Sequence, residues 1–384
     1  MDGDSWRPGA VRCPAAVRST GRRSSSPVRG PTSAAERKAT SPGETQSSEE
    51  QPLVSVGLPT WQRAHVLRRA IDSVLGQTYE NLELVVADNG SQDGTQAICE
   101  EYRQLDGRVR YFRHATNIGP TENFNSILRR ARGDYMMFLA DDDWIENTYL
   151  QHCLDALRDH PDRVLARGKA RYFNAGELVG RGEPVNLIES SPSRRVRAYF
   201  GSVEWNDEFY GLVPQDIWAR VGPIPKGLGN DLLVVARIAF LGKMVTLETT
   251  EFNRATGGIA DNPAAIAQAY GISPRQAQAP FLSAAWFAVS DITWRSSVYQ
   301  PLAPIQRLVL ALSCGPLLLV RMYRLHFRRV QKMNQVRKQL RRWSRRVDRG
   351  GRRRLKRASK RARVVRRRSV RLLRRRAGAL LLRR

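Results

Sequence analysis

The chain has 384 residues, with 64 Lys and Arg against 36 Asp and Glu, and a formal net charge of +28. Residues 321–384 hold 29 of the basic residues and a single acid, Asp348, so the rest of the chain carries no net charge. This distribution excludes a uniformly basic, nucleic-acid-coating protein and indicates a neutral body with a polycationic tail. The four Cys residues stand far apart, without the spacing of a zinc site or a disulfide scaffold.

The first 51 residues are rich in Ser, Pro, Gly, Arg and Thr. Such a composition cannot bury enough apolar surface to order itself, which predicts a disordered segment over 1–51. A start codon assigned too far upstream is the alternative. The segment has no apolar core of the kind found in a secretory signal.

Between Leu53 and Leu139, short apolar runs alternate with stretches whose apolar residues recur at helical spacing. The predicted strands are 53–58, 82–87, 109–112 and 135–139, and the predicted helices are 63–77, 95–105 and 121–131. This alternation predicts parallel βαβ units in an open, mostly parallel α/β sheet flanked by helices. Ligands of such sheets bind beyond the carboxyl ends of the strands.

The second half of the chain has a less regular pattern. Residues 165–173 and 178–180 predict a hairpin, and 243–248 predict a strand. Residues 181–206 are expected to form a loop region with one short helix. Further helices are predicted over 214–221, 231–241, 274–298 and 304–329, the last interrupted near Gly315-Pro316.

Three consecutive acids, Asp141, Asp142 and Asp143, follow the fourth predicted strand. Adjacent carboxylates repel each other, and a divalent cation such as Mg²⁺ or Mn²⁺ would remove that cost. A cation held by one or two carboxylates completes its shell with phosphates and water, so the triplet favours a metal that bridges a nucleotide diphosphate. A solvated acidic turn or a helix cap is the alternative.

A second polar cluster, from Asp88 to Asp93, ends the second predicted strand. Asp and Asn are common turn residues, and Asp93 could cap the helix that follows. Beside the acidic triplet, Asp88 is placed to accept a hydrogen bond from the imide of a pyrimidine base.

Four segments of the chain resemble the family 2 glycosyltransferases, which have the GT-A fold. The segments are 54–63 (VSVGLPTWQR), 71–79 (IDSVLGQTY), 85–95 (VVADNGSQDGT) and 131–143 (ARGDYMMFLADDD). The resemblance covers roughly residues 53–175, with a weaker match to about 257. It implies a GT-A-like domain over 52–258, followed by a helical extension over 259–320 and the polybasic tail over 321–384.

The resemblance also implies an inverting transfer of a sugar from a nucleotide-sugar donor, with Mn²⁺ or Mg²⁺ as cofactor. Asp142 matches the metal-binding acid of the family's DxD motif, and Asp143 is a further candidate metal ligand. The implied donor-binding residues are Pro59, Thr60, Arg63, Asp88, Asn117, Asp141 and Arg254. Among these, Thr60 and Asp88 match positions that contact the base, and Arg254 resembles a late basic position that faces the pyrophosphate.

An inverting transfer also needs a general base for the acceptor hydroxyl. Asp231, before the apolar stretch 232–241, matches the acid that family members carry at the start of a helix, and we expect it to be the catalytic base. A plain helix cap is the alternative role of Asp231. Asp207, Glu208 and Asp216 are rival candidates for the base.

We expect a single sugar addition, with a UDP- or dTDP-sugar favoured and a GDP-sugar left open, onto a lipid-linked or cell-envelope glycan. The apolar run 308–320 has 13 residues, fewer than the roughly 20 that a spanning helix needs, so it predicts an interfacial or core helix. The tail, 321–384, is expected to lie on the anionic inner face of the membrane, which implies a cytoplasmic, peripheral protein. Nucleic acid binding and a solvated tail are the alternatives.

Two other functions compete with this one. A degenerate, non-catalytic transferase domain could hold a membrane or nucleic acid through its tail, but the intact acids count against it. A sugar-phosphate nucleotidyltransferase should carry a glycine-rich loop after its first strand, and residues 59–63 lack those glycines.

Overall fold

The computed structural model describes residues 51–256, 276, 278–325 and 327. The predictions for the N-terminal segment up to residue 50 and for the tail beyond 327 lie outside the described residues. The predicted domain boundary at residue 258 also falls outside them, so the division of the chain stays a prediction.

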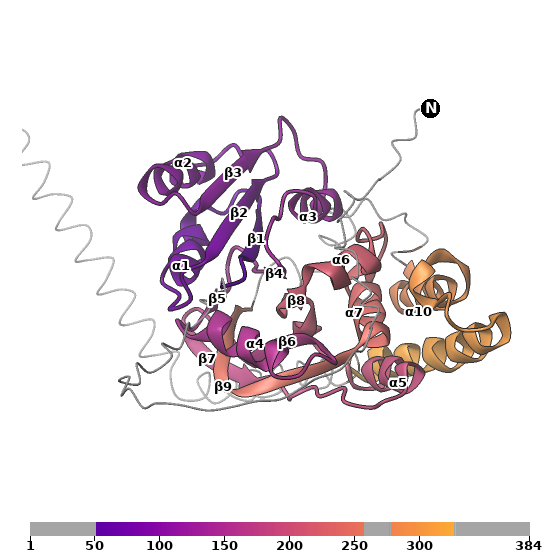
Figure 1. The fold of residues 1–384 in the computed structure, drawn as a ribbon. Helices are drawn as coiled ribbons and strands as arrows, with labels where there is room; N and C mark the ends of the chain where they lie inside the picture. Colours follow the sequence, from indigo (N-terminus) through magenta and orange to yellow (C-terminus); the bar gives the residue numbers. More distant parts are fainter. Residues whose placement is uncertain (1–50, 257–275, 277, 326, 328–384) are drawn as a thin grey trace, which may run out of the picture.

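A five-stranded sheet with the order β3-β2-β1-β4-β8 forms the first layer (Figure 1). The strands β1 (Val54–Thr60), β2 (Leu82–Asp88), β3 (Val109–Arg113) and β4 (Tyr135–Phe138) run parallel, and the short β8 (Val213–Pro214) pairs antiparallel with β4. Strands β1 and β2 are almost entirely buried, as expected for central parallel strands written as continuous apolar runs. The predicted open, mostly parallel α/β sheet is therefore confirmed.

Helices cover both faces of this sheet. Helices α1 (Ala64–Leu75) and α2 (Thr95–Leu105) lie on one side of it and α3 (Pro120–Leu128) on the other (Figure 1). Leu67 and Ile71 of α1 share a core with Val56 of β1, whereas Ile127 of α3 shares a second core with Phe138 of β4. This division follows from the alternation of side chains between the two faces of a strand.

A second sheet has the order β5-β9-β6-β7. Its strands are β5 (Trp144–Ile145), β6 (Arg163–Asn174), β7 (Glu177–Arg181) and β9 (Lys243–Ala255). The predicted β6–β7 hairpin is confirmed, but β9 is twice as long as the predicted strand because it pairs in parallel with β6 along most of its length. Helix α4 (Tyr149–Arg158) packs on this sheet.

The remaining elements surround the second core. They are α5 (Pro192–Ser202), the 3-10 turn η1 (Asp207–Tyr210), α6 (Gln215–Val221), α7 (Asn230–Leu241) and α10 (Pro280–Ser290). The single helix predicted over 274–298 is wrong, because α10 passes into the π-helical turn η3 (Asp291–Arg295) and the 3-10 turn η4 (Ser297–Tyr299). The buried ion pair between Arg237 Nη2 and Asp291 Oδ1, 2.5 Å long, ties η3 to α7.

The last described helix runs from Pro304 to Leu325 without a break, so the predicted interruption at Gly315-Pro316 is wrong. Gly315 lies against α10 so closely that a Cβ there would come within 2.6 Å of Val289 Cγ2. Residues of this helix pack into the second core, and that packing offsets the roughly 3 kcal/mol that an interior Pro costs. The helical extension expected after the sheet domain is thus present.

By length and composition alone, helix 304–325 is apolar enough to cross a membrane. The prediction counted only the 13 apolar residues between two arginines, whereas the whole helix has 22 residues. A core helix of a soluble protein meets the same criterion.

Candidate active site

The carboxyl ends of the parallel strands bring three polar segments to one edge of the sheet. Thr60 at the end of β1 pairs in register with Asp88 at the end of β2, and the backbone N–H of Asn89 donates to the carbonyl of Thr60 (2.9 Å). The acidic triplet begins three residues after the last residue of β4, the other neighbour of β1. The expectation that these segments share one edge follows directly from the parallel topology.

The Asp88 side chain is fully buried, with 0% of it exposed, and organises the turn after β2. Its Oδ1 accepts a hydrogen bond from the N–H of Ser91 (2.8 Å), and its Oδ2 accepts one from the hydroxyl of Tyr111 (2.9 Å). Arg113 Nε lies 3.5 Å from the same Oδ2. Asp88 therefore stands at the predicted edge, where Tyr111 and Arg113 of β3 contact its carboxylate.

Asn117 lies in the loop between β3 and α3 and is bound to the turn after β2. Asn89 Nδ2 donates to Asn117 Oδ1 (2.9 Å), and Asn89 Oδ1 accepts from the N–H of Ile118 (2.8 Å). Gly90, the residue after Asn89, has φ of +74°, and a Cβ there would come within 2.8 Å of the backbone of Thr116. Glycine is thus needed both for the turn and for the approach of this loop.

The segment that leads from β1 into α1 is held by the β2–α2 turn. The N–H of Gln62 donates to Ser91 Oγ (2.8 Å), and the N–H of Ala64 donates to Asp93 Oδ2 (3.1 Å). Asp93 Oδ1 also accepts from the N–H of Thr95 (3.0 Å), the first residue of α2, although the N-cap position itself is Gly94. These contacts fix the backbone at Arg63.

Arg63 bridges the first two acids of the triplet. Its Nε lies 3.3 Å from Asp141 Oδ1, and its Nη2 donates to Asp142 Oδ2 at 2.8 Å. Burial, together with the neighbouring charge of Asp142, raises the pKa of Asp141 to about 6 despite this arginine. The two carboxylates therefore converge on one position of positive charge.

The third acid, Asp143, points towards β9. Its side chain is only 2% exposed, its Oδ1 accepts from the N–H of Ala255 (2.8 Å), and Arg254 Nε lies 3.5 Å from its Oδ2. Burial raises the pKa of Asp143 to about 8, and Arg254 counteracts this effect only in part. Among the described residues, its Oδ2 has no hydrogen-bond partner.

Arg254 links the acidic triplet to the turn η1. Its Nη1 donates to Asp207 Oδ1 (2.7 Å), and its guanidinium lies 5.0 Å from the ring centre of Tyr210. The contact between Arg254 and Asp143 has a weak sequence signal, because it depends on the extended pairing of β9 with β6. Arg254 was expected to face the donor, and the structure shows it between two carboxylates.

Asp231 is the second residue of α7 and borders a cavity of about 70 Å³. The lining residues are Thr121, Phe124, Phe209, Tyr210, Ile224, Asn230 and Asp231. Asn206 Nδ2 donates to Asp231 Oδ2 (2.9 Å), and the hydroxyl of Tyr199 donates to Asn206 Oδ1. Asn206 adopts a left-handed conformation with φ of +52°, so this positioning residue was not visible in the sequence.

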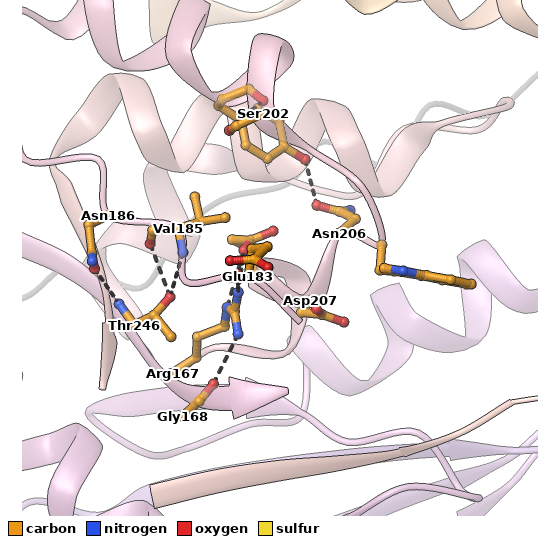
Figure 2. A network of polar contacts seen from close by, with 12 residues as sticks. Arg167, Gly168, Glu183, Val185, Asn186, Ser202, Asn206, Asp207 and Thr246 are labelled. Carbon is orange, nitrogen blue, oxygen red and sulfur yellow. Dashed lines mark hydrogen bonds and ion pairs between the residues drawn. The ribbon is translucent and has the colours of Figure 1, made fainter. Parts of the chain in front are cut away.

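The three rival acids have other surroundings. Glu208 forms a buried ion pair with Arg167, whose Nη2 lies 2.7 Å from its Oε1. Figure 2 shows Arg167 in its polar network, with Asn206 and Asp207 nearby. Asp207 accepts from Tyr172 (2.7 Å) as well as from Arg254. Asp216 is the second residue of α6, which follows β8. Because β8 pairs with the start of β4, Asp216 lies at the opposite edge of the sheet from the acidic triplet.

The described residues contain no cluster of three or more His, Cys, Asp or Glu able to hold a metal by themselves. The carboxylates of Asp141 and Asp142 do converge on one cation, the guanidinium of Arg63. Such a pair fits a hard divalent cation that takes its other ligands from phosphates and water. The residues present thus fit a metal that arrives with a phosphorylated ligand, with Asp143 nearby but turned towards Arg254.

Residues 55–202 match the family model described as glycosyl transferase family 2. This part of the chain belongs to that family. The match contains the turn after β2, the acidic triplet and Arg63, and it ends before Asp207, Asp231 and Arg254. The family and the observed sheet together agree with the GT-A-like fold expected from the sequence.

Curated relatives are similar over part of the chain. Glycosyltransferase GlyA of Streptococcus pneumoniae is 36% identical over 124 residues, which are 32% of this chain and 18% of GlyA. A GalNAc(5)-diNAcBac-PP-undecaprenol beta-1,3-glucosyltransferase of Campylobacter jejuni is 37% identical over 93 residues, 24% of this chain and 30% of that protein. The chain spans about half or less of the length of the curated relatives it matches.

Among solved structures, S. aureus TarS 1–349 in complex with UDP-GlcNAc is similar with a TM-score of 0.43 and 17% identity. That similarity covers 67% of this chain and 79% of the TarS chain.

Proposed function

We propose that the chain is an inverting glycosyltransferase that moves one sugar from a nucleotide-sugar donor to a hydroxyl acceptor. The observation that carries the proposal is the acidic triplet at the carboxyl edge of a family 2 domain, linked through Arg254 and Tyr210 to a cavity bordered by Asp231. One continuous set of contacts would thereby join the residues proposed to bind the donor to Asp231, the proposed general base.

On the donor side, we assign contacts with the nucleotide base to Thr60 and Asp88, and contacts with the ribose or the transferred sugar to Asp141. Asp142 and Asp141 would hold Mn²⁺ or Mg²⁺, which when bound neutralises the charge that develops on the leaving diphosphate. Asp143 stays a candidate ligand. Arg63 and Arg254 form ion pairs with carboxylates of the triplet, and we assign them to the diphosphate, with Pro59 and Asn117 shaping the donor pocket.

On the acceptor side, Asp231 would take the proton of the attacking hydroxyl. Asn206 donates to its Oδ2, so we assign the proton to Oδ1, which the amide leaves to the acceptor. The cavity beside Asp231 has the aromatic side chains of Phe124, Phe209 and Tyr210 in its wall. An aromatic wall with one carboxylate suits a sugar ring, which presents both C–H and hydroxyl groups.

The number of sugars added needs its own measurement. Residues 339–343, Gln-Leu-Arg-Arg-Trp, fit the Gln-or-Arg-x-x-Arg-Trp motif of processive synthases in this family, although they lie in the polybasic tail and outside the described residues. Single addition is supported by one candidate spanning helix among the described residues, where a processive synthase carries several. Mass analysis of products at excess donor separates one added sugar from a ladder.

We further propose a lipid-linked or cell-envelope acceptor and a cytoplasmic location at the inner face of the membrane. The similarity to a glucosyltransferase whose named acceptor is linked to undecaprenol supports this choice, as does the polybasic tail 321–384. Nucleic acid is not an expected partner, because the body of the chain has no net charge.

A thermal-shift panel of UDP-, dTDP- and GDP-sugars, each with and without Mn²⁺, tests the donor side. A ligand that binds the native state raises its stability, so the matching donor should raise Tm, and more so with metal. Transfer assays on a lipid-linked acceptor extract then test the reaction. Absence of both binding and transfer for every donor, combined with tail-dependent binding of lipid or RNA, would favour the degenerate, non-catalytic alternative.

A further inference from the structure

Helix 304–325 has two apolar faces. Leu310, Ala311, Cys314 and Leu318 are buried in the second core. On the opposite side, exposed residues recur every three or four positions, with Pro316 between them, and are 48–65% exposed. These residues are Ile305, Val309, Leu312, Val320 and Tyr323. A surface helix in water normally has polar residues on this side, so the pattern indicates an apolar environment.

A neighbouring group of exposed apolar side chains belongs to α10 and η3. Trp286 is 60% exposed and Trp294 is 61% exposed, and their rings contact each other edge to face with centres 5.9 Å apart. The rings of Phe281 and Tyr323, 5.0 Å apart, connect α10 with helix 304–325, which lies beside it in orange at the right of Figure 1. Trp is the side chain most typical of the boundary between lipid and water.

The charged residues of this stretch of the sequence have one sign. The sequence has no Asp or Glu between residues 292 and 347, and the same stretch carries Arg295, Arg307, Arg321 and Arg324 even before the densest part of the tail. Glu204 of the neighbouring segment pairs with one of these arginines, its Oε2 lying 3.6 Å from Arg321 Nη2. An exposed apolar stripe on a stretch with an excess of cations complements a surface with an apolar interior and anionic headgroups. It does not complement a basic or neutral protein surface.

The helix is fastened to the sheet domain near its carboxyl end and to η3 near its amino end. Arg321 Nε donates to the carbonyl of Val203 (3.0 Å), and its Nη2 donates to the carbonyl of Ser202 (2.9 Å). At the other end, Arg307 Nη1 donates to the carbonyl of Thr293 (3.3 Å). A helix that crossed the bilayer would have to break these bonds and expose its core face, so the contacts favour a helix lying in the plane of the interface.

We propose that the stripe Ile305, Val309, Leu312, Val320 and Tyr323, together with Trp286 and Trp294, is a docking surface for an anionic lipid bilayer. The stripe enters the boundary between headgroups and acyl chains, while the arginines of the same helix face the headgroups. This surface is separate from the tail's electrostatic attraction, and it fixes which side of the domain faces the lipid. The inference concerns binding alone and does not depend on the transfer reaction.

Flotation of the full chain with vesicles tests the proposal. Vesicles of phosphatidylcholine with 30% phosphatidylglycerol are compared at about 0.1 M and 0.5 M salt, because high salt screens the tail but not apolar contact. The double variant V309D/L312D is matched with L105D/V179D, which places the same charge on exposed apolar residues elsewhere in the domain. Circular dichroism melting of each variant checks that the fold survives.

We expect V309D/L312D to lose at least tenfold in vesicle partition at 0.5 M salt, whereas L105D/V179D partitions like the unaltered chain. Trp286 and Trp294 fluorescence should shift to the blue with vesicles, and the shift should disappear in W286F/W294F. Equal partition of the two double variants would overturn the proposal in favour of the tail alone. A dimer in light scattering that V309D/L312D converts to a monomer would overturn it in favour of a second copy of this chain.

Discussion

Arg63 and Asp142 are joined by a 2.8 Å ion pair that crosses from the start of α1 to the turn after β4. The same guanidinium contacts Asp141, so one side chain neutralises two carboxylates at the edge where the donor is proposed to bind. Arg63 therefore occupies the electrostatic role that a divalent cation would have, and a cation bound as proposed would compete with Arg63 for the same oxygens.

Replacing Arg63 with Met should tighten Mn²⁺ binding in the absence of donor, by about tenfold, because a competing charge is removed from a partly buried site. The reference variant is Arg68→Met. It removes an exposed arginine of α1 that pairs with Glu101 of α2 and does not contact the acidic triplet. Titration of free Mn²⁺ by electron paramagnetic resonance measures both variants. Unchanged or weaker Mn²⁺ binding in Arg63→Met would show that the two carboxylates do not form a cation site.

Asp142→Ala should lower transfer by about 10³-fold or more, because a bound cation contributes several kcal/mol of charge stabilisation to the transition state. Residual activity should no longer respond to Mn²⁺ or to EDTA. Asp159→Ala, at the exposed end of α4, is the control and should retain full activity. Full, metal-independent transfer by Asp142→Ala would remove Asp142 from the site.

Asp231→Asn should lower kcat by about 10²–10⁴-fold while the donor-induced rise in Tm persists, because a general base acts on the acceptor. Asn206→Ala should change the pH profile of kcat more than the donor KM, because it alters the hydrogen bond to Asp231 Oδ2. If Asp231→Asn instead lowers Tm with normal turnover, then Asp231 only caps α7.

Glu208→Gln should destabilise the domain by about 3–5 kcal/mol, because it leaves Arg167 charged and unpaired in the interior. The double variant R167M/E208L should recover much of that loss, since it removes both charges. Urea unfolding measures the two variants. Little change in stability with a large loss of activity in Glu208→Gln would bring Glu208 back as a rival for the base.

We expect Glu83 to contribute to the loss of stability of the fold at low pH. Burial opposes its ionisation, but hydrogen bonds from Ser55, the N–H of Arg132 and Arg110 outweigh burial and lower its pKa below 4.5. A lowered folded pKa contributes stability above the unfolded value, and that contribution is lost as the pH falls through the folded value. Urea unfolding between about pH 6 and 3 should show a weaker pH dependence in Glu83→Gln than in the original chain.

Periodicity was sufficient for the first half of the fold, because strands buried on both faces and amphipathic helices leave clear patterns. Parallel topology then brought residues 59–63, 88–93 and 141–143 to one edge. Periodicity could not show contacts that depend on the backbone conformation. Examples are the hydrogen bond from Asn206, which has a left-handed backbone, to Asp231, and the contact of Arg254 with Asp143, which depends on the full length of β9. The break expected at Pro316 failed because tertiary packing outweighed a local penalty.

The pairing of Asp143 with Arg254 and Ala255 sets a lower limit on the smallest active piece of this protein. The family match stops at residue 202, yet the last acid of the triplet is completed by a strand that ends at Ala255. A fragment cut at the end of the match would keep every acid of the triplet and lose the partners of one of them. Transfer activity in any shortened chain is therefore expected only when it extends through β9.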